Sequence, residues 1–486
     1  MKRLENPARR FAAAALAAAA GLAGCSVNPA TGERQVMLMS EAQEIAIGRE
    51  ADPEIVAEMG LYDDPGLQQY VSGLGRELAA KSERPDLPWT FRVLDDPTVN
   101  AFALPGGFIY VTRGILSHLE TEAELVAVLG HEIGHVTARH GANRLSKAQL
   151  AQVGLVVGSV ASPEFARFAG LAETGLGLLF LKYSRDDERQ ADELGLRYTI
   201  RGGYDAREMP EVFSTLERVS RAEGGDRGAL PSWLSTHPDP GARRERALQA
   251  IAESGIDFGG TTVAREEYLG RLDGLVFGDN PREGFFRGGR FLHPDLRFQL
   301  DFPAEWKTRN TRRSVDALSP QQDAALRLAL SPEADPYQAA RQFLAQGGIS
   351  AEAPRRGEIG GFPAAGGYFE VPGERPLAGR VAFLRDGDTT FMLLGYTLQD
   401  KWRGYSSEIG GFVDSYRRLT DPEALAVQPA RLQIVEPSSD LPLERFAQQY
   451  GASVPLETLA LINQMEVGQV LRAGRRAKTV HGGLGS

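Results

Sequence analysis

Hydrophobic side chains recur with a helical period over roughly the first 280 residues of the chain. Leu125, Val128 and Leu129 form one apolar stripe, and Thr121 followed three residues later by Glu124 is typical of a capping box. We therefore predict a helix that begins just after Thr121 and is closed by Gly141.

Beyond this point the pattern changes to glycine-rich alternation. Four apolar side chains of LRFQLDFP share one strand face: Leu296, Phe298, Leu300 and Phe302. The segment RVAFLRDGDTTFMLLGY predicts a hairpin that turns at Asp386 and Gly387. A helix follows, with four apolar positions at helical spacing: Ile409, Phe412, Val413 and Tyr416. Residues 285–420 are therefore expected to form an α+β domain.

Residues 150–184 are unusually apolar for a segment inside the chain. Pro163, Glu164 and Arg167 divide the segment, and neither half reaches the roughly 20 residues that a membrane-spanning helix needs. We expect a buried helical hairpin here, with a flap over the cleft or against the membrane as the alternative.

The segment LGHEIGHVTARHG is a candidate for a functional site, because it holds three of the seven histidines in the chain. His131 and His135 lie one helical turn apart on one face, whereas His140 lies about 180° round the helix from His131. The HExxH spacing lets two neutral imidazoles bind one zinc ion, and Glu132 can take a proton from a water molecule at the metal. The alternative is a chance match on a surface helix, which a third ligand would exclude.

The third ligand is sought further along the chain. The metzincin signature requires glycine at position 138 and histidine at position 141, where this chain has Ala138 and Gly141. The segment YSRDDERQADELGLRY offers Glu188, with Asp192 one turn later on the same face. We predict that Glu188 binds the metal and that Asp192 orients a ligating imidazole; a solvated acidic face is the alternative.

Four segments, in this order, resemble the gluzincin zinc metallopeptidases that include HtpX, the CAAX prenyl protease and the BepA-type envelope proteases: VNAFALPGGFIYVTRGIL (99–116), AELVAVLGHEIGHVTARH (123–140), YSRDDERQADELG (183–195) and STHPDPGARR (235–244). The resemblance implies a mainly α, zincin-like endopeptidase domain with a small sheet over residues 25–280. It also implies one catalytic zinc ion.

The same resemblance implies roles for single residues. It implies that His131, His135 and Glu188 are the zinc ligands and that Glu132 is the catalytic base. It also implies that Asn100, Ala101 and Phe102 bind the substrate. Physical reasoning adds that FIYVT, after the LPGG turn, is a short strand that can offer an unpaired edge to an extended peptide.

His237, in STHPDP, belongs to a segment that overlies the metal in the related family, and Arg243 falls where that family has an arginine. Two roles stay open for His237: a hydrogen bond to the oxyanion of the scissile carbonyl, or a resting-state zinc ligand that blocks the water site. Pro238 and Pro240 stiffen this loop. The remaining histidines receive no functional role: His118, His140, His293 and His481.

The first 25 residues determine the expected compartment. A basic start, an apolar FAAAALAAAAGLA and LAGC ending at Cys25 resemble a bacterial lipoprotein signal, with residues 1–24 removed. Acylation of Cys25 would then anchor the protein in a membrane, and Ser26 favours the outer membrane, facing the periplasm. Cys25 is also the single cysteine, so no disulfide forms within the chain.

Two C-terminal modules follow the peptidase domain. The 285–420 domain resembles PsbP or Mog1-like domains and shows no catalytic cluster, which indicates a binding or positioning module. The tail, residues 428–482, follows the order strand, helix, helix, strand and resembles a LysM domain, which typically binds N-acetylglucosamine polymers. Because SSDLPL replaces the usual turn, peptidoglycan and an envelope protein are both open as its ligand.

At 486 residues the chain is too long for one core, so we expect a multidomain protein of three folded units. A net charge of −10 argues against nucleic acid as a partner. Two functions remain: a lipid-anchored zinc endopeptidase that acts on misfolded or misassembled envelope proteins, or an envelope assembly factor with restrained or vestigial protease activity. The intact HExxH with Glu188 and Asp192 favours the first.

Overall fold

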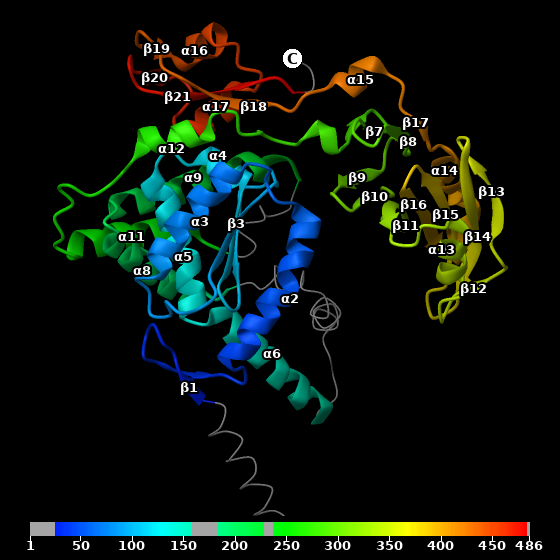
Figure 1. Ribbon diagram of the computed structural model, residues 1–486, viewed down its shortest axis with the longest axis horizontal. Coiled ribbons are helices and arrows are strands. Elements are labelled where there is room, and N and C mark those ends of the chain that lie inside the picture. Colours follow the sequence, from blue (N-terminus) through cyan, green and yellow to red (C-terminus); the bar gives the residue numbers. More distant parts are fainter. Residues whose placement is uncertain (1–24, 158–182, 228–236, 484–486) are drawn as a thin grey trace, which may run out of the picture. The chain divides into compact units, whose positions relative to one another are not determined.

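The computed structural model describes residues 25–157, 183–227 and 237–483 and divides the chain into two compact units (Figure 1). The first unit runs to Gly278, apart from Ala57–Met59, and also takes in Arg431–His481. The second unit centres on Asp279–Ala430. The expected signal peptide and most of the apolar 150–184 segment lie outside the described residues, and the domain boundaries expected from sequence stay predictions.

The first unit is mainly helical up to residue 278. Its elements are β1 (Cys25–Val27), β2 (Arg34–Val36), α2 (Glu41–Met59), α3 (Pro65–Ala79), β3 (Thr90–Leu94), β4 (Ala101–Leu104), β5 (Phe108–Thr112), α4 (Arg113–His118), α5 (Glu122–Thr137), α6 (His140–Val157), α8 (Arg185–Gly202), η2 (Ala206–Glu208), α9 (Met209–Arg227), α11 (Pro240–Glu253) and α12 (Arg265–Leu272).

Helix α5 carries the HExxH motif. Its predicted capping box is present: the Thr121 side chain accepts from the Glu124 N–H, and Glu124 accepts in return. The helix ends earlier than predicted, at Thr137, because Arg139 has a φ of 60° and breaks the helical path. Gly141 therefore lies inside α6 and does not close α5, which corrects the prediction.

A three-stranded sheet, in the order β3-β5-β4, packs beside this helix. The FIYVT segment is β5, and it pairs with β3 in parallel and with β4 antiparallel. The expectation that FIYVT offers a free edge is therefore wrong, because the parallel partner Thr90–Leu94 was not recognised as a strand. The edge next to α5 belongs to β4, Ala101–Leu104.

The tail folds in the predicted order. It contains β18 (Arg431–Val435), β19 (Leu441–Pro442), α16 (Leu443–Gln449), α17 (Leu456–Ile462), β20 (Val470–Leu471) and β21 (Ala477–His481). Strands β18 and β21 pair antiparallel, and β18 and α17 contact α12 and α4 of the same unit (Figure 1).

The second unit is an α+β structure. Its elements are η3 (Pro281–Glu283), β6 (Phe285–Arg287), β7 (Arg290–His293), β8 (Phe298–Asp301), β9 (Lys307–Asn310), β10 (Ser314–Leu318), β11 (Ala324–Ser331), α13 (Pro336–Leu344), β12 (Ser350–Ala351), β13 (Arg355–Ile359), β14 (Phe362–Val371), β15 (Leu377–Asp386), β16 (Thr389–Leu398), η4 (Gln399–Lys401), α14 (Trp402–Asp414), β17 (Arg417–Arg418) and α15 (Pro422–Ala426).

The large sheet of this unit has the strand order β12-β14-β15-β16-β11-β10-β9 and is covered on both faces. Successive side chains of β15 point to opposite faces of this sheet. Val381 and Phe383 pack in the core beneath α13, whereas Ala382 and Leu384 pack with α14. The predicted hairpin is present, but Asp386 pairs with Thr389, so its turn lies one residue later than predicted.

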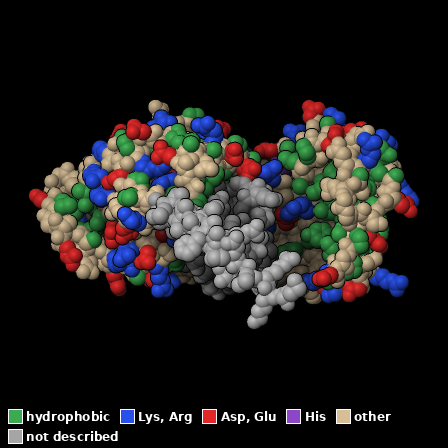
Figure 2. All heavy atoms as spheres, turned by 90° about the horizontal axis from the view of Figure 1, so that it is seen from below, with side chains coloured by type: hydrophobic (Ala, Val, Ile, Leu, Met, Phe, Trp, Pro, Cys, Tyr) green, Lys and Arg blue, Asp and Glu red, His purple; other side chains and the backbone are tan. Residues whose placement is uncertain are grey.

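One predicted strand face is also shorter than expected. Phe298, Leu300 and Phe302 are buried, but Leu296 is exposed and precedes β8, because the chain turns before the strand begins. None of the helices in the described ranges is both long enough and apolar enough to cross a membrane. On the face shown in Figure 2, acidic and basic side chains are interspersed.

Candidate metal centre

Helix α5 presents both histidines of the HExxH motif to one point. Because the two residues are one turn apart, their rings lie side by side, and the Nε2 atoms of His131 and His135 are 3.0 Å apart. Both side chains are buried. Two ring nitrogens this close need a proton or a cation between them, because two lone pairs would otherwise repel each other.

Helix α8 brings Glu188 to the same point. Its Oε1 lies 3.5 Å from His135 Nε2, and its Oε2 lies 3.7 Å from His131 Nε2. The approach depends on glycine: a Cβ added at Gly195 would come within 2.9 Å of the His131 backbone nitrogen, and one at Gly130 within 3.0 Å of the Gly195 carbonyl. Close contact between α5 and α8 thus places the carboxylate between the two rings.

His237 completes a group of four. Its Nδ1 lies 2.9 Å from Glu188 Oε1 and 3.3 Å from His131 Nε2. Each of four buried residues offers one atom that could bind a metal ion, and these four atoms lie within 4.8 Å of one another: His131, His135, Glu188 and His237. We call these four residues the metal cluster.

The metal cluster fits a tetrahedral zinc ion. Zinc–nitrogen and zinc–oxygen bonds of about 2.0 to 2.2 Å place neighbouring ligands about 3.4 Å apart. The separations given above, from 2.9 to 3.7 Å, bracket that value. Three imidazoles and one carboxylate are also a donor set that suits zinc.

Glu132 lies beside the cluster. Its carboxylate is buried, and its Oε1 is 3.8 Å from His237 Nε2. Within the described part of the chain, its Oε2 has no hydrogen-bond partner. Burial raises the pKa of Glu132, and a raised pKa suits a group that must accept a proton and pass it on. Glu132 thus has a buried carboxylate oxygen beside the cluster, and its role as the base stays a prediction.

Asp192 and Arg243 contact two side chains of the metal cluster, His131 and Glu188. Asp192 Oδ1 is 3.0 Å from Nδ1 of His131, the ring nitrogen that faces away from the cluster. Arg243 donates two hydrogen bonds to Asp192 and forms an ion pair with Glu188 Oε2 at 2.9 Å. Burial opposes ionisation of Glu188, but the positive charges of His237 and Arg243 outweigh it and hold the pKa of Glu188 well below its usual range.

Two further contacts to His135 were not assigned from sequence. His140 Nδ1 lies 2.9 Å from His135 Nδ1, and the Tyr183 ring stacks on the His135 ring at a centroid distance of 3.8 Å. His140 was given no role because, on an uninterrupted helix, it points away from His131. The break at Arg139, whose φ is positive, turns it back toward His135, and helical periodicity alone does not predict that break.

The predicted substrate residues lie on and before the edge strand β4. Ala101 and Phe102 are in the strand, and Asn100 precedes it. The Asn100 backbone carbonyl accepts from Thr112 N, whereas its buried side-chain Oδ1 has no partner among the described residues. An extended peptide paired with β4 would run alongside α5.

A cavity of about 20 Å³ touches His131, Glu132 and Arg243, and its other walls are apolar side chains of α4, α5 and α9. That volume holds about one water molecule. A larger cavity of about 250 Å³ lies in the second unit and contains none of the cluster residues.

The region that contains the metal cluster is similar in sequence to known proteins. Residues 65–252, which include the whole metal cluster, match Peptidase family M48. The mitochondrial metalloendopeptidase OMA1 of Schizosaccharomyces pombe is 32% identical over 232 residues, which cover 47% of this chain and 67% of that protein. The chain belongs to peptidase family M48. The resemblance predicted from the four motifs is thereby confirmed.

Other M48 relatives match over smaller shares of their length. The beta-barrel assembly-enhancing protease of Yersinia pestis is 34% identical over 225 residues, covering 43% of this chain and 45% of that protein. The corresponding protein of Escherichia coli (strain K12) is 28% identical over 323 residues, covering 63% and 59%. The chain thus spans less than two thirds of the length of these two relatives.

Solved structures similar to this chain include cyanobacterial PsbP from Synechocystis sp. PCC 6803. The similarity has a TM-score of 0.22 at 14% identity and covers 26% of this chain and 91% of that one. The PsbP/Mog1-like and LysM-like assignments stay predictions. A peptidase domain of family M48, joined to helical and sheet regions in a multidomain chain, is established.

Proposed function

We propose that this chain is a zinc-dependent endopeptidase of the cell envelope that acts on misfolded or misassembled proteins. The observation that carries the proposal is the metal cluster, with four buried donor atoms within 4.8 Å and Glu132 beside them. His131, His135 and Glu188 hold the ion in this proposal. When bound, zinc supplies a Lewis acid and lowers the pKa of a water molecule.

The residues of the chain supply the rest of the reaction. The edge of β4 binds the substrate backbone, and Asn100 Oδ1, which has no hydrogen-bond partner among the described residues, accepts from a substrate N–H. Glu132 accepts a proton from the attacking water and delivers it to the leaving amine. Asp192 and Arg243 keep the His131 ring and Glu188 in orientation.

His237 restrains the enzyme at rest in this proposal. Its ring closes the fourth corner of the cluster, where a water molecule must bind. This closure also keeps the alternative function open, an assembly factor whose protease activity is restrained. Movement of His237 would then precede cleavage.

Substrate class and location rest on relatives and on the N-terminal pattern. Two relatives are named beta-barrel assembly-enhancing proteases, which supports envelope proteins as substrates. The lipoprotein-like LAGC at Cys25 supports a lipid anchor in the outer membrane, facing the periplasm. If this is right, Cys25→Ser will move the protein from the membrane fraction to the soluble fraction, and a protein that still sediments with membranes would refute the anchor.

The βααβ order of the tail supports a LysM-like unit, with peptidoglycan or an envelope protein as its ligand. For the second unit, the sheet covered by α13 and α14 supports a PsbP/Mog1-like binding or positioning module. Neither module supplies a residue to the metal cluster.

The decisive experiment compares Glu132→Gln with Glu193→Gln, which makes the same change at an exposed position on α8. Both variants should bind about one zinc ion. Glu132→Gln should lose casein cleavage by at least about 10³-fold and retain client proteins in cells, because it lacks the base. Full complementation of a deletion strain by Glu132→Gln would refute the protease function and favour the assembly factor.

A further inference from the structure

The tail is docked on the first unit through backbone pairing. Gly274 N donates to Leu432 O at 2.9 Å, and Leu432 N donates to Leu275 O at 2.8 Å. Asp273 accepts from Ile434 N at 2.9 Å. Strand β18 is thus held by the segment that follows α12, which brings the rest of the tail to the α4–α5 corner.

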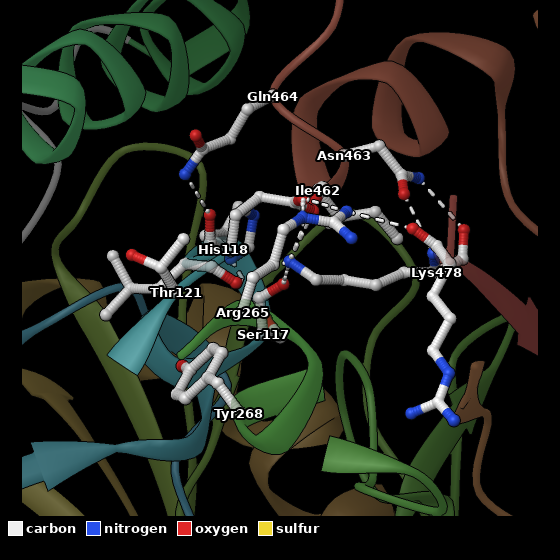
Figure 3. A network of polar contacts seen from close by, with 12 residues as sticks. Ser117, His118, Thr121, Arg265, Tyr268, Ile462, Asn463, Gln464 and Lys478 are labelled. Atoms are coloured by element: carbon white, nitrogen blue, oxygen red, sulfur yellow. Dashed lines mark hydrogen bonds and ion pairs between the residues drawn. The ribbon is translucent and has the colours of Figure 1, made fainter. Parts of the chain in front are cut away.

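Lys478 reaches this corner from β21. Its side chain is fully buried, and its Nζ donates to the carbonyls of Ser117 at 3.1 Å, Leu119 at 2.6 Å and Ile462 at 2.6 Å (Figure 3). Glu120 Oε1 lies 3.4 Å away. An ammonium group has three hydrogens, so every donor of Lys478 is used, and two of them hold the segment that leads into α5.

Gln464 reaches the beginning of α5 itself. Its Nε2 donates to the His118 carbonyl at 3.2 Å and to Glu124 Oε1 at 2.8 Å. Figure 3 shows Gln464 pointing from the tail toward His118. Glu124 is the residue whose other oxygen closes the capping box of α5. The tail therefore contributes a hydrogen bond to the first turn of the HExxH helix.

The first turn and the metal cluster are mechanically connected. Glu124 and His131 are seven residues apart, about 10 Å along the helix and on the same face. Every residue of α5 from Ala123 to Thr137 is buried, so the helix has close neighbours along this whole length. A displacement of its first turn will therefore be carried to the histidines.

We propose that Gln464 and Lys478 are positioning residues of the peptidase: the tail fixes the start of α5 and so sets the place of His131, Glu132 and His135 relative to the β4 edge. This inference rests on the proposed endopeptidase function. In this proposal the LysM-like tail binds a site within its own chain, the corner formed by α4 and α5. Neither residue touches substrate or metal.

The test uses the full chain with Gln464→Glu, which puts an acceptor against the His118 carbonyl without a change in size. The matched control is Gln448→Glu, the same change at an exposed position on α16. Lys478→Met, with Arg445→Met as its exposed control, removes the ammonium group. Each protein is assayed for bound zinc, for kcat and KM on a fluorescent casein-derived peptide, and for amide hydrogen exchange in residues 117–135.

We expect Gln464→Glu to bind one zinc ion, to lower kcat about 10-fold with KM within twofold, and to speed exchange at the start of α5. Lys478→Met should do the same to a larger extent, and both controls should match wild type. Unchanged kcat despite faster exchange, or unchanged exchange in both variants, would overturn the inference. Absence of cleavage by both zinc-loaded wild type and zinc-loaded His237→Ala would instead overturn the proposed function, because exchange reports docking without it.

Discussion

Two buried polar clusters lie along helix α5 and differ in how their groups are satisfied. Near its start, Glu120, Glu124, Gln464 and Lys478 form what we call the docking cluster. Two turns later lies the metal cluster. Both are enclosed by protein and combine charges of both signs, so burial and charge alone do not distinguish a structural site from a functional one.

The two clusters differ in how their polar atoms are arranged relative to one another. In the docking cluster, the Lys478 ammonium meets three carbonyls and the Gln464 amide meets a carbonyl and a carboxylate. In the metal cluster, the possible ligand atoms of four side chains converge on one point, as in the 3.0 Å contact between the Nε2 atoms of His131 and His135, and Arg243 pairs with Glu188 beside them. Ring nitrogens and a carboxylate that converge on one point indicate a cation site, whereas a buried ammonium and a buried amide that donate to carbonyls indicate structure.

The largest expected difference between the clusters is in metal content. His131→Ala should abolish stoichiometric zinc binding and lower casein cleavage by more than about 10³-fold, because it removes a ligand from a three-residue set. Lys478→Met should retain one zinc ion per chain. Metal analysis after gel filtration measures both, and full zinc occupancy in His131→Ala would place the ligand set elsewhere.

A smaller effect is expected from a change at His140, which contacts His135 of the metal cluster but is not itself a member of the cluster. His140→Leu removes the group that faces His135 Nδ1, so it should weaken zinc affinity about 10- to 100-fold without abolishing binding. Competition with a chromophoric chelator gives the affinity. An affinity equal to that of wild type would show that the ring of His135 is held by packing on Tyr183 alone.

A pH effect is expected beside the docking cluster. Burial lowers the pKa of His118 from 6.5 to about 4, so the unfolded chain binds a proton that the folded chain excludes. The stability contributed by neutral His118 is present above about pH 6.5 and is lost as the pH falls toward 4, by about 2 kcal/mol between pH 7.5 and 5. Burial raises the pKa of Glu124 on α5 to about 8, which favours the folded chain as the pH falls, so the test is the difference between two proteins: wild type should lose stability relative to His118→Gln, as hydrogen exchange in α4 and α5 measures. Equal losses in the two proteins would contradict it.

The restraint proposed for His237, at the fourth corner of the metal cluster, predicts the smallest effect. His237→Ala should raise basal self-cleavage about 10-fold if the imidazole restrains the enzyme at rest. If His237 instead donates a hydrogen bond to the oxyanion, turnover should fall by about 10² to 10³. The two roles predict opposite signs, and a casein assay with matched zinc content separates them.

Features encoded within one turn or one hairpin could be predicted from sequence. The capping box of α5, the common face of His131 and His135, and the β15–β16 hairpin all depend on neighbours a few residues apart. Family M48 was recognisable for a related reason, since four short motifs occur in order. Even here, one unrecognised backbone break at Arg139 misplaced the end of α5 and concealed the contact of His140.

The sequence by itself therefore determined the kind of chemistry and the helix that carries it, because helical period and motif spacing are local properties of the chain. Only the tertiary structure decided which edge strand lies beside that helix, how His237 meets Glu188 from 49 residues away, and where Gln464 binds a carbonyl 346 residues distant. Such contacts depend on how closely packed elements approach, as Gly130 and Gly195 allow for α5 and α8, and no local pattern specifies that approach.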